Sequence, residues 1–238
     1  MNSLTPRICY EDASILVVDK PAGLLLHPTG RASTEYTLVD WLVKHVPSLN
    51  TVGDDPARPG IVQRLDRAAS GLLVIAKTTA AFEALKKQFA DHRVQKEYLA
   101  LVHGTMPRTE GTIALSIGRA TGKRGRGRFV AKPTTADGKT AVTHFVVEAS
   151  NPRYTLLTVR TETGRTHQIR AHLAAYGHPI VGDTEYVSKR WKNNDAPRLF
   201  LHATRLGITH PMHGQWIEWK SALPAELSCV LEQKHLRV

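Results

Sequence analysis

The sequence predicts an α+β fold with a mainly antiparallel central sheet and flanking helices and loops. Short β-branched or alternating apolar runs outnumber helical patterns, and the two kinds of pattern are not regularly interleaved. A doubly wound parallel sheet requires regular interleaving, so the sequence disfavours it. The chain has 238 residues, of which 42% are apolar, enough to bury the core of one medium domain or of two small lobes. We expect one domain over residues 1–238.

The first part of the chain is expected to contain three strands and two helices. A β-branched run closed by a turn that contains proline and glycine predicts the first strand. A loop rich in Gly, Pro and Asp over residues 53–60 precedes the second, and Thr37 is expected near the N-cap of the first helix. The strands are expected over 15–18, 72–76 and 98–102, and the helices over 37–46 and along the apolar face of Phe82, Leu85 and Phe89.

The second part of the chain is predicted to be mostly strand, with one helix. The helix is expected over residues 167–175, where Gly177 is suited to end it. Short alternating or β-branched segments predict the strands. They are expected over 112–117, 141–147, 154–161, 199–203 and 216–219.

The charge of the chain indicates a nucleic acid as its partner. The formal net charge is +11 at pH 7, and a polyanion gains from such a field through counterion release and electrostatic steering. The alternative is a basic protein whose charge only maintains solubility.

Cysteine content and hydropathy exclude several other classes. Cys9 and Cys229 are the only cysteines, which leaves no disulfide framework and no paired-cysteine metal site. The apolar runs are too short to cross a bilayer, and the first twelve residues lack the pattern of a secretory signal. We therefore expect a cytoplasmic protein without membrane contacts.

One stretch, the basic loop of residues 119–132, is rich in arginine, lysine and glycine and contains no acidic residue. Arginine and glycine together give a positive, adaptable surface that suits an irregular phosphate path, so we interpret the loop as a segment that binds nucleic acid. The alternative is a solvated hairpin tip whose charge serves solubility. The side chains expected to bind the nucleic acid are Arg124, Arg126 and Arg128.

Residues 60–71 place Asp66 between two arginines, just before a buried strand. Arg64 and Arg67 are both expected to reach its carboxylate, and a nearby cation keeps a carboxylate ionised. An ionised carboxylate suits a nucleophile or a general base. The same pattern also fits an ion pair that only pins a loop.

Residues 163–173 (TGRTHQIRAHL) place several hydrogen-bond donors at a turn and at the start of a helix. The amides of a helix start, with Arg165 and Arg170, predict an anion site. His167 and His172 are five positions apart, about 140° around a helix, so a shared metal ion is not expected. The chain also lacks the glycine-rich fingerprints of nucleotide sites, so no cofactor is expected.

Motifs along nearly the whole chain resemble those of the RluA family of pseudouridine synthases, in the same order and at matching distances. This resemblance implies an α+β catalytic domain with a basic cleft that isomerises uridines of structured transfer or ribosomal RNA to pseudouridine. It implies base flipping, cleavage of the C1′–N1 bond and re-attachment through C5, and it requires no cofactor. The motifs are ILVVDKPAGLLLHP at 15–28, Arg64-Leu65-Asp66 with SGLL at 70–73, KEY at 96–98, TGRTHQIRAHL at 163–173, GHPIVGDTEY at 177–186 and LHA at 201–203.

The resemblance also assigns roles to single residues. Asp66 matches the catalytic aspartate, Tyr98 the residue that stacks on the target uracil, and Arg170 the partner that holds the aspartate. Arg64 matches a residue that helps to fill the gap left by the flipped uridine, and Leu201 an apolar position near the pocket. Contacts with phosphate or the pocket wall are expected from Arg165, Thr166 and His167.

Two residues beside the aspartate depart from the family pattern, which usually has His at the position of Gln63 and Thr at that of Ala69. Gln cannot carry a charge and Ala lacks a hydroxyl, so loop support or RNA contact is expected to differ. Only fourteen residues precede the first motif. We therefore expect a compact member without an S4 domain, acting as a monomer without an obligate protein partner.

Two other functions are compatible with parts of this pattern. A non-catalytic RNA-binding factor on the same fold is mildly favoured by Gln63 and Ala69. A carboxylate-dependent nuclease or glycosidase requires a second acid or a metal ion near Asp66.

Overall fold

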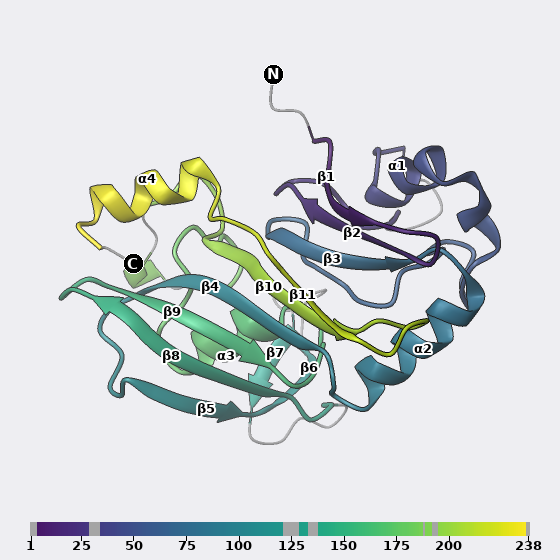
Figure 1. Cartoon of the computed structure of the whole chain (residues 1–238). Helices are drawn as coiled ribbons and strands as arrows, with labels where there is room; N and C mark the ends of the chain where they lie inside the picture. The colour runs from purple at the N-terminus through teal and green to yellow at the C-terminus, as the bar shows by residue number, and fades with distance from the viewer. Residues whose placement is uncertain are drawn as a thin grey trace. The chain divides into compact units, whose positions relative to one another are not determined.

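Two compact units make up the computed structural model, which describes residues 4–28, 34–120, 129–132, 138–187, 189–191 and 195–236 (Figure 1). The first unit contains Met1–Lys96 and Ala203–Ser221, and the second contains Glu97–His202 and Ala222–Val238. Each unit combines helices with a mainly antiparallel sheet, which confirms the predicted α+β class. The single domain expected over residues 1–238 stays a prediction.

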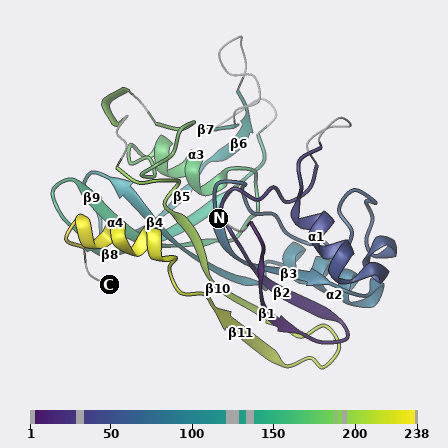
Figure 2. The ribbon, with the colours of Figure 1, turned by 90° about the horizontal axis from the view of Figure 1, so that it is seen from above.

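The sheet of the first unit has the strand order β1-β2-β3-β10, with β11 paired to β10. β1 pairs with β2, β2 with β3 and β10 with β11, all antiparallel. Figure 2 shows β10 and β11 as a long hairpin. The strands are β1 (Arg7–Glu11), β2 (Ile15–Lys20), β3 (Ser70–Ala76), β10 (Leu201–Thr209) and β11 (Trp216–Lys220).

Alternate residues of three strands pack against helix α2 (Thr79–Ala90) and form the core of this unit. The predicted helix face is confirmed, because Phe82 and Leu85 are buried in this core and Phe89 packs against it. Fully burying a side chain of this size contributes about 1.5–3 kcal/mol. The strand residues of the core are Ile15, Val17, Leu72, Val74, Ala76, Leu206 and Ile208.

Helix α1 (Leu38–His45) begins at Thr37, as predicted. The Thr37 hydroxyl accepts a hydrogen bond from the Asp40 amide, and the Asp40 carboxylate accepts one from the Thr37 amide, which is a capping box. A short 3-10 helix, η1 (Pro47–Thr51), follows directly. These bonds fix the start of the helix after the loop that follows β2.

Gly71 in β3 allows a close approach between two strands. Its φ is +117°, and a Cβ atom at this position would lie 2.3 Å from the carbonyl oxygen of Ala203 in β10. Any other residue would force these strands apart, so glycine is required here.

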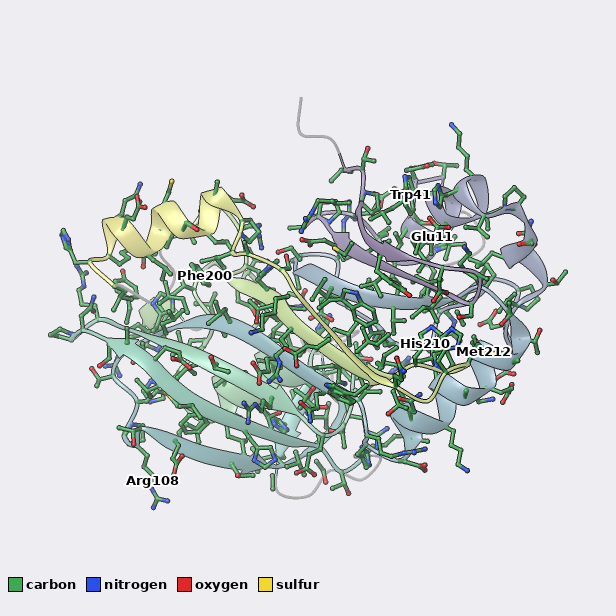
Figure 3. The ribbon with its side chains drawn as sticks, in the orientation of Figure 1. Glu11, Trp41, Arg108, Phe200, His210 and Met212 are labelled. Carbon is green, nitrogen blue, oxygen red and sulfur yellow. The ribbon has the colours of Figure 1, made fainter. Side chains whose placement is uncertain are left out.

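The turn between β10 and β11 is tied to the turn between β1 and β2 by His210. Its Nε2 lies 2.8 Å from Oδ2 of Asp12, and the His210 side chain is fully buried, whereas Met212 in the same turn is 56% exposed (Figure 3). Asp12 also accepts hydrogen bonds from the amides of Ser14 and Ile15. This carboxylate therefore joins two hairpins of the first unit.

The second unit has an antiparallel sheet of order β4-β9-β8-β5. Helix α4 (Ala225–Gln233) covers one face of this sheet, and Nζ of Lys234 lies 5.0 Å from the ring centroid of Tyr154 (Figures 1 and 2). β6 and β7 form a separate two-stranded antiparallel sheet. The other elements are β4 (Gln95–His103), β5 (Glu110–Ala114), β6 (Ser116–Arg119), β7 (Phe129–Lys132), β8 (Val142–Ser150), β9 (Tyr154–Thr161), α3 (Gln168–Ala175) and η2 (Lys189–Trp191).

Several boundaries differ from the prediction. The strand expected over 112–117 is two strands in different sheets, since the Leu115 carbonyl between them lies 3.1 Å from Nε2 of His172 rather than in a ladder. The strand expected over 199–203 continues as β10 to Thr209. β1, β7 and α4 were not predicted, because each is short and only partly apolar.

Candidate active site

Asp66 lies in the first unit, in the loop that leads into β3, and is partly buried. Its carbonyl oxygen accepts a hydrogen bond from the amide of Ala69 at 3.1 Å, which closes a tight turn directly after it. The loop and the strand start are thus joined by the backbone itself.

A buried lysine is hydrogen-bonded to the backbone of the same loop. Lys20 ends β2 and is fully buried, and its Nζ donates to three carbonyl oxygens, those of Pro21 at 2.8 Å, Leu24 at 3.0 Å and Arg67 at 3.3 Å. The Arg67 carbonyl also accepts from the Gly23 amide at 2.7 Å. The backbone next to Asp66 is therefore anchored to the turn after β2 by an ammonium group and an amide.

The arginines beside Asp66 do not act as predicted. Nε of Arg67 donates to the Gly23 carbonyl at 3.0 Å, and its Nη1 lies 3.0 Å from Oε2 of Glu35. Arg64 is exposed and makes no ion pair within the described part of the chain. The expectation that both arginines reach Asp66 is wrong, because the turn at Arg67 directs that side chain toward the turn after β2.

The two departures from the family pattern also lie in this loop. Nε2 of Gln63 is buried and finds no hydrogen-bond acceptor among the described residues. Ala69 is fully buried. Within the described residues, neither Nε2 of Gln63 nor the methyl group of Ala69 supplies a hydrogen bond to the loop.

In the second unit, Arg170 lies on α3 and is only 4% exposed. Its Nε and Nη2 donate to the Asp183 carboxylate at 2.7 and 2.9 Å, and Nη2 also donates to Oε1 of Glu185 at 3.1 Å. Burial alone would raise the pKa of Asp183, but the bonds from Arg170 and from the amides of Tyr186 and Glu185 hold this pKa below its ordinary value. The Arg170 guanidinium is thus fixed by an ionised, fully buried carboxylate.

The turn before α3 is held by Gln168. Its Oε1 accepts from the Thr163 hydroxyl at 2.7 Å and the Arg165 amide at 3.0 Å, and its Nε2 donates to the Val142 carbonyl at 2.9 Å. His167 starts the helix with a left-handed φ of 54°. Arg165 is exposed and Thr166 partly buried. The anion site expected at this turn stays a prediction.

His167 and His172 contact protein groups on other elements. His172 is fully buried, its Nδ1 lies 2.9 Å from the Thr143 hydroxyl, and burial lowers its pKa. Among the described residues, no group of three or more His, Cys, Asp or Glu side chains is arranged to hold a metal ion. The same part of the chain contains no helix long and apolar enough to cross a membrane.

The remaining predicted residues lie on strands or outside the described residues. Tyr98 is 9% exposed on β4 and pairs with Val159 of β9, and Leu201, 3% exposed, starts β10. Arg124, Arg126 and Arg128 lie outside the described residues. The roles of these residues stay predictions.

Four residues that hold the two regions received no role from the sequence: Lys20, Asp183, Glu185 and Tyr186. Their signal was present, since a lysine ended an apolar strand and two acids with a tyrosine stood in a motif at 177–186. Their partners lie far away in the sequence or on other elements, so only the structure shows which groups they hold.

This fold and these motifs define an RNA-modifying isomerase. The profile of the family described as RNA pseudouridylate synthase matches residues 14–175. The chain therefore belongs to the RNA pseudouridylate synthase family, of the RluA type that its motifs resemble, and it is an RNA uridine isomerase.

Relatives of known sequence agree with this assignment. The chain is 40% identical over 225 residues to the uncharacterized RNA pseudouridine synthase YlyB of Bacillus subtilis, covering 94% of this chain and 71% of that protein. It is 41% identical over 232 residues to ribosomal large subunit pseudouridine synthase D of Nitrosomonas europaea, covering 95% of this chain and 64% of that one. The chain thus spans about two thirds of the length of these relatives.

A solved structure with the same fold is that of human RNA pseudouridylate synthase domain containing 1. It superposes with a TM-score of 0.75 at 27% sequence identity, covering 95% of this chain and 88% of that chain.

Proposed function

We propose that this enzyme isomerises a specific uridine in a structured ribosomal or transfer RNA, with Asp66 as its catalytic carboxylate. The observation that carries the proposal is the Asp66 loop, whose backbone is fixed by the Ala69 amide on one side and by Lys20 and Gly23 on the other. The enzyme is expected to act in the cytoplasm as a monomer and without a cofactor.

The reaction needs a fixed, ionised carboxylate. The C1′–N1 bond breaks, C1′ joins C5 of the same uracil, the C5 proton leaves and N1 regains a proton, so atoms and electrons balance. Asp66 is proposed either to add to the sugar or base or to abstract a sugar proton. We assign Arg170 to hold this carboxylate, and the support for that role is a guanidinium already oriented by Asp183 at 2.7 Å and by Glu185 at 3.1 Å.

Access to the target base is the second requirement. Flipping a uridine costs a few kcal/mol, least in loops and bulges. Tyr98 is proposed to stack on the flipped uracil, which recovers roughly 1–3 kcal/mol. Arg64 is proposed to help fill the gap that the base leaves. Other contacts to RNA or to the pocket wall are assigned to Leu201, Arg165, Thr166 and His167.

The basic loop is proposed to bind the RNA backbone. Replacing Arg124, Arg126 and Arg128 with alanine is expected to weaken RNA binding and to reduce the slope of its salt dependence, by about 1 for each phosphate that the loop no longer neutralises. Binding is measured by titration at several salt concentrations. A control of equal charge replaces three exposed cations elsewhere, Lys44, Arg108 (Figure 3) and Lys220. Equal salt-dependence slopes for the two variants would mean that the charge of the loop serves solubility rather than RNA binding.

Pseudouridine mapping at nucleotide resolution tests the function itself. Unmodified ribosomal and transfer RNAs are incubated with the wild type or with Asp66→Asn and probed with a chemical adduct, because the isomerisation leaves the mass unchanged. New sites made only by the wild type are expected, and they identify the substrate. RNA binding without modification by either protein would contradict the proposal and favour a non-catalytic RNA-binding factor.

A further inference from the structure

Two buried glutamines have both ends of the amide group hydrogen-bonded, one in each unit. Nε2 of Gln88, on α2, donates to the Thr209 carbonyl at 2.7 Å, and its Oε1 accepts from the Thr209 amide at 2.9 Å. Oε1 of Gln168 accepts from the Thr163 hydroxyl at 2.7 Å, and its Nε2 donates to the Val142 carbonyl at 2.9 Å. These bonds follow the general rule that a polar group removed from water finds a partner within the protein.

Gln63, three residues before Asp66, departs from this rule. Its Nε2 is buried and has no hydrogen-bond acceptor among the described residues, although the side chain as a whole is only partly buried. A buried donor without an acceptor carries the desolvation cost of the group and gains nothing in return. Such a group in a native protein requires an explanation, and beside a reacting residue the simplest one is an acceptor that arrives with the substrate.

The backbone on both sides holds Gln63 close to Asp66. Before it, Ile61 forms an antiparallel bridge to β3, and Val62 packs against the apolar core of the first unit. After it, the Asp66 carbonyl accepts from the Ala69 amide at 3.1 Å. The Cα atoms of two residues three positions apart are separated by at most about 11 Å. A nucleotide that adjoins a uridine bound at Asp66 is therefore within reach of the Gln63 amide.

The chemistry of the amide indicates which group of the RNA it binds. Nε2 of Gln63 can only donate, so its partner must be an acceptor. The side chain is uncharged, whereas phosphate groups are bound most strongly by charged donors. Glutamine is among the residues that read base edges, and the unstacked bases of RNA loops expose these edges. The partner that fits best is a neutral acceptor, on a base or on a ribose 2′-hydroxyl.

We infer that Gln63 is a specificity-determining residue that donates a hydrogen bond to a neutral acceptor of the nucleotide beside the target uridine. The inference rests on the proposed function, since it places the target at Asp66. It also gives the departure from the family pattern a consequence. The histidine usual at this position becomes a cation when it is protonated, whereas the Gln63 amide does not titrate. The contact made by Gln63 is therefore expected to keep its strength between pH 5 and 8.

A methionine of similar length separates a role in binding from a role in the fold. Gln63→Met removes no hydrogen bond from the free protein, so its urea midpoint is expected to equal or exceed that of the wild type. Gln88→Met is the matched control in the same unit, and its midpoint is expected to fall because both bonds to Thr209 are lost. A fall in Gln63→Met as large as that in Gln88→Met would show that Gln63 supports the fold and would overturn the inference.

Single-turnover assays test the contact with RNA. A stem-loop around a uridine that the wild type modifies is prepared with each flanking nucleotide replaced, either by another base or by its 2′-deoxy form. One replacement is expected to lower the second-order rate constant of the wild type about fivefold, the value of one neutral hydrogen bond, and to leave that of Gln63→Met unchanged. An effective base change identifies the base as the acceptor, and an effective 2′-deoxy change identifies the ribose. If Gln63→Met responds to every replacement as the wild type does, the inference is wrong.

The two readouts separate the possible failures. If the wild type forms no pseudouridine in any RNA, the proposed function fails, while the urea midpoints still report whether the Gln63 amide supports the fold. If the wild type is active and Gln63→Met modifies the same RNAs at the same rates, only the inference about Gln63 fails.

Discussion

In the first unit, the loop of Asp66 is held at its backbone carbonyl groups, which accept hydrogen bonds from the Ala69 amide, the Gly23 amide and the ammonium group of Lys20. In the second unit, Arg170 is held by other side chains, the carboxylates of Asp183 and Glu185 and the ring of Tyr186. The two regions are both fixed, but by different kinds of group.

This difference explains which positions tolerate change. Gln63 and Ala69 flank Asp66 and supply no polar contact to the loop, so a residue other than the usual one is compatible with the same backbone. Arg170 depends on the identity of its buried partner Asp183, since a buried charge without its partner is costly. Substitutions in the two regions should therefore lower the free energy of unfolding by different amounts.

The largest effect on stability is expected from Asp183→Asn. It leaves the shape of the side chain but removes the charge that the buried Arg170 requires, so the free energy of unfolding should fall by about 3–5 kcal/mol. Turnover should fall at least about 100-fold, because a misoriented Arg170 would lose about 3 kcal/mol of transition-state stabilisation. Urea unfolding and single-turnover rates measure the two quantities.

Glu185→Gln is the control for this prediction. Glu185 contacts the same Nη2 at 3.1 Å, but its side chain is 48% exposed, so its loss should cost less than about 1 kcal/mol. Equal destabilisation by the two substitutions would contradict the dominant role of the buried pair.

A smaller effect is expected from Lys20→Met in the first unit. It preserves an apolar stem of similar length but leaves the buried carbonyl of Leu24 and the partly buried carbonyls of Pro21 and Arg67 without their shared donor. The free energy of unfolding should fall by about 2–3 kcal/mol, and turnover should fall because the Asp66 loop loses one anchor. Lys44→Met, at an exposed position on α1, is the control, and a loss no greater than in this control would show that Lys20 does not support the loop.

The smallest effect is a difference in acid sensitivity between the units. Burial lowers the pKa of His172 and of His103, both in the second unit. As the pH falls through the ordinary histidine pKa of about 6.5, the unfolded chain binds protons before the folded unit does, so stability of the second unit is lost.

In the first unit, the carboxylic acid with a strongly lowered pKa is Asp12. Burial would raise its pKa, but hydrogen bonds from the Ile15 and Ser14 amides and from His210 outweigh burial and lower it. Its contribution to stability is therefore present above about pH 4 and lost only below it.

Hydrogen exchange between pH 7 and 5, corrected for the intrinsic exchange rate, should thus show protection falling in the second unit before the first. His172→Gln should reduce that fall. A loss of protection that begins in the first unit would contradict the assignment.

Local patterns predicted much of the fold. Strand β9 has the predicted bounds, 154–161, because the segment is rich in Thr, Val, Leu and Tyr, and Thr37 caps α1 because a capping box is local in sequence. The split between β5 and β6 was not predictable, since the bond from His172 to Leu115 joins residues far apart in the sequence.

The site shows the same division. The motifs predicted roles for Asp66 and Arg170, but the groups that contact the Asp66 loop and the Arg170 side chain could not be read from the sequence. Arg67 is adjacent to Asp66 in sequence, yet it bonds to Gly23 and Glu35, which lie on the turn after β2 and beyond. Side-chain direction in a tight turn depends on tertiary contacts, which sequence spacing does not specify.

The most direct test of Asp66 as the catalytic carboxylate is the rate at which Asp66→Asn releases the C5 hydrogen. RNA containing uridine tritiated at C5 is mixed with excess enzyme, and tritium release and RNA affinity are measured in parallel. Asp66→Asn is expected to bind RNA within a few fold of the wild type while release falls at least about 10⁴-fold, a loss of more than 5 kcal/mol of transition-state stabilisation. Release within tenfold of the wild-type rate would contradict the catalytic role of Asp66.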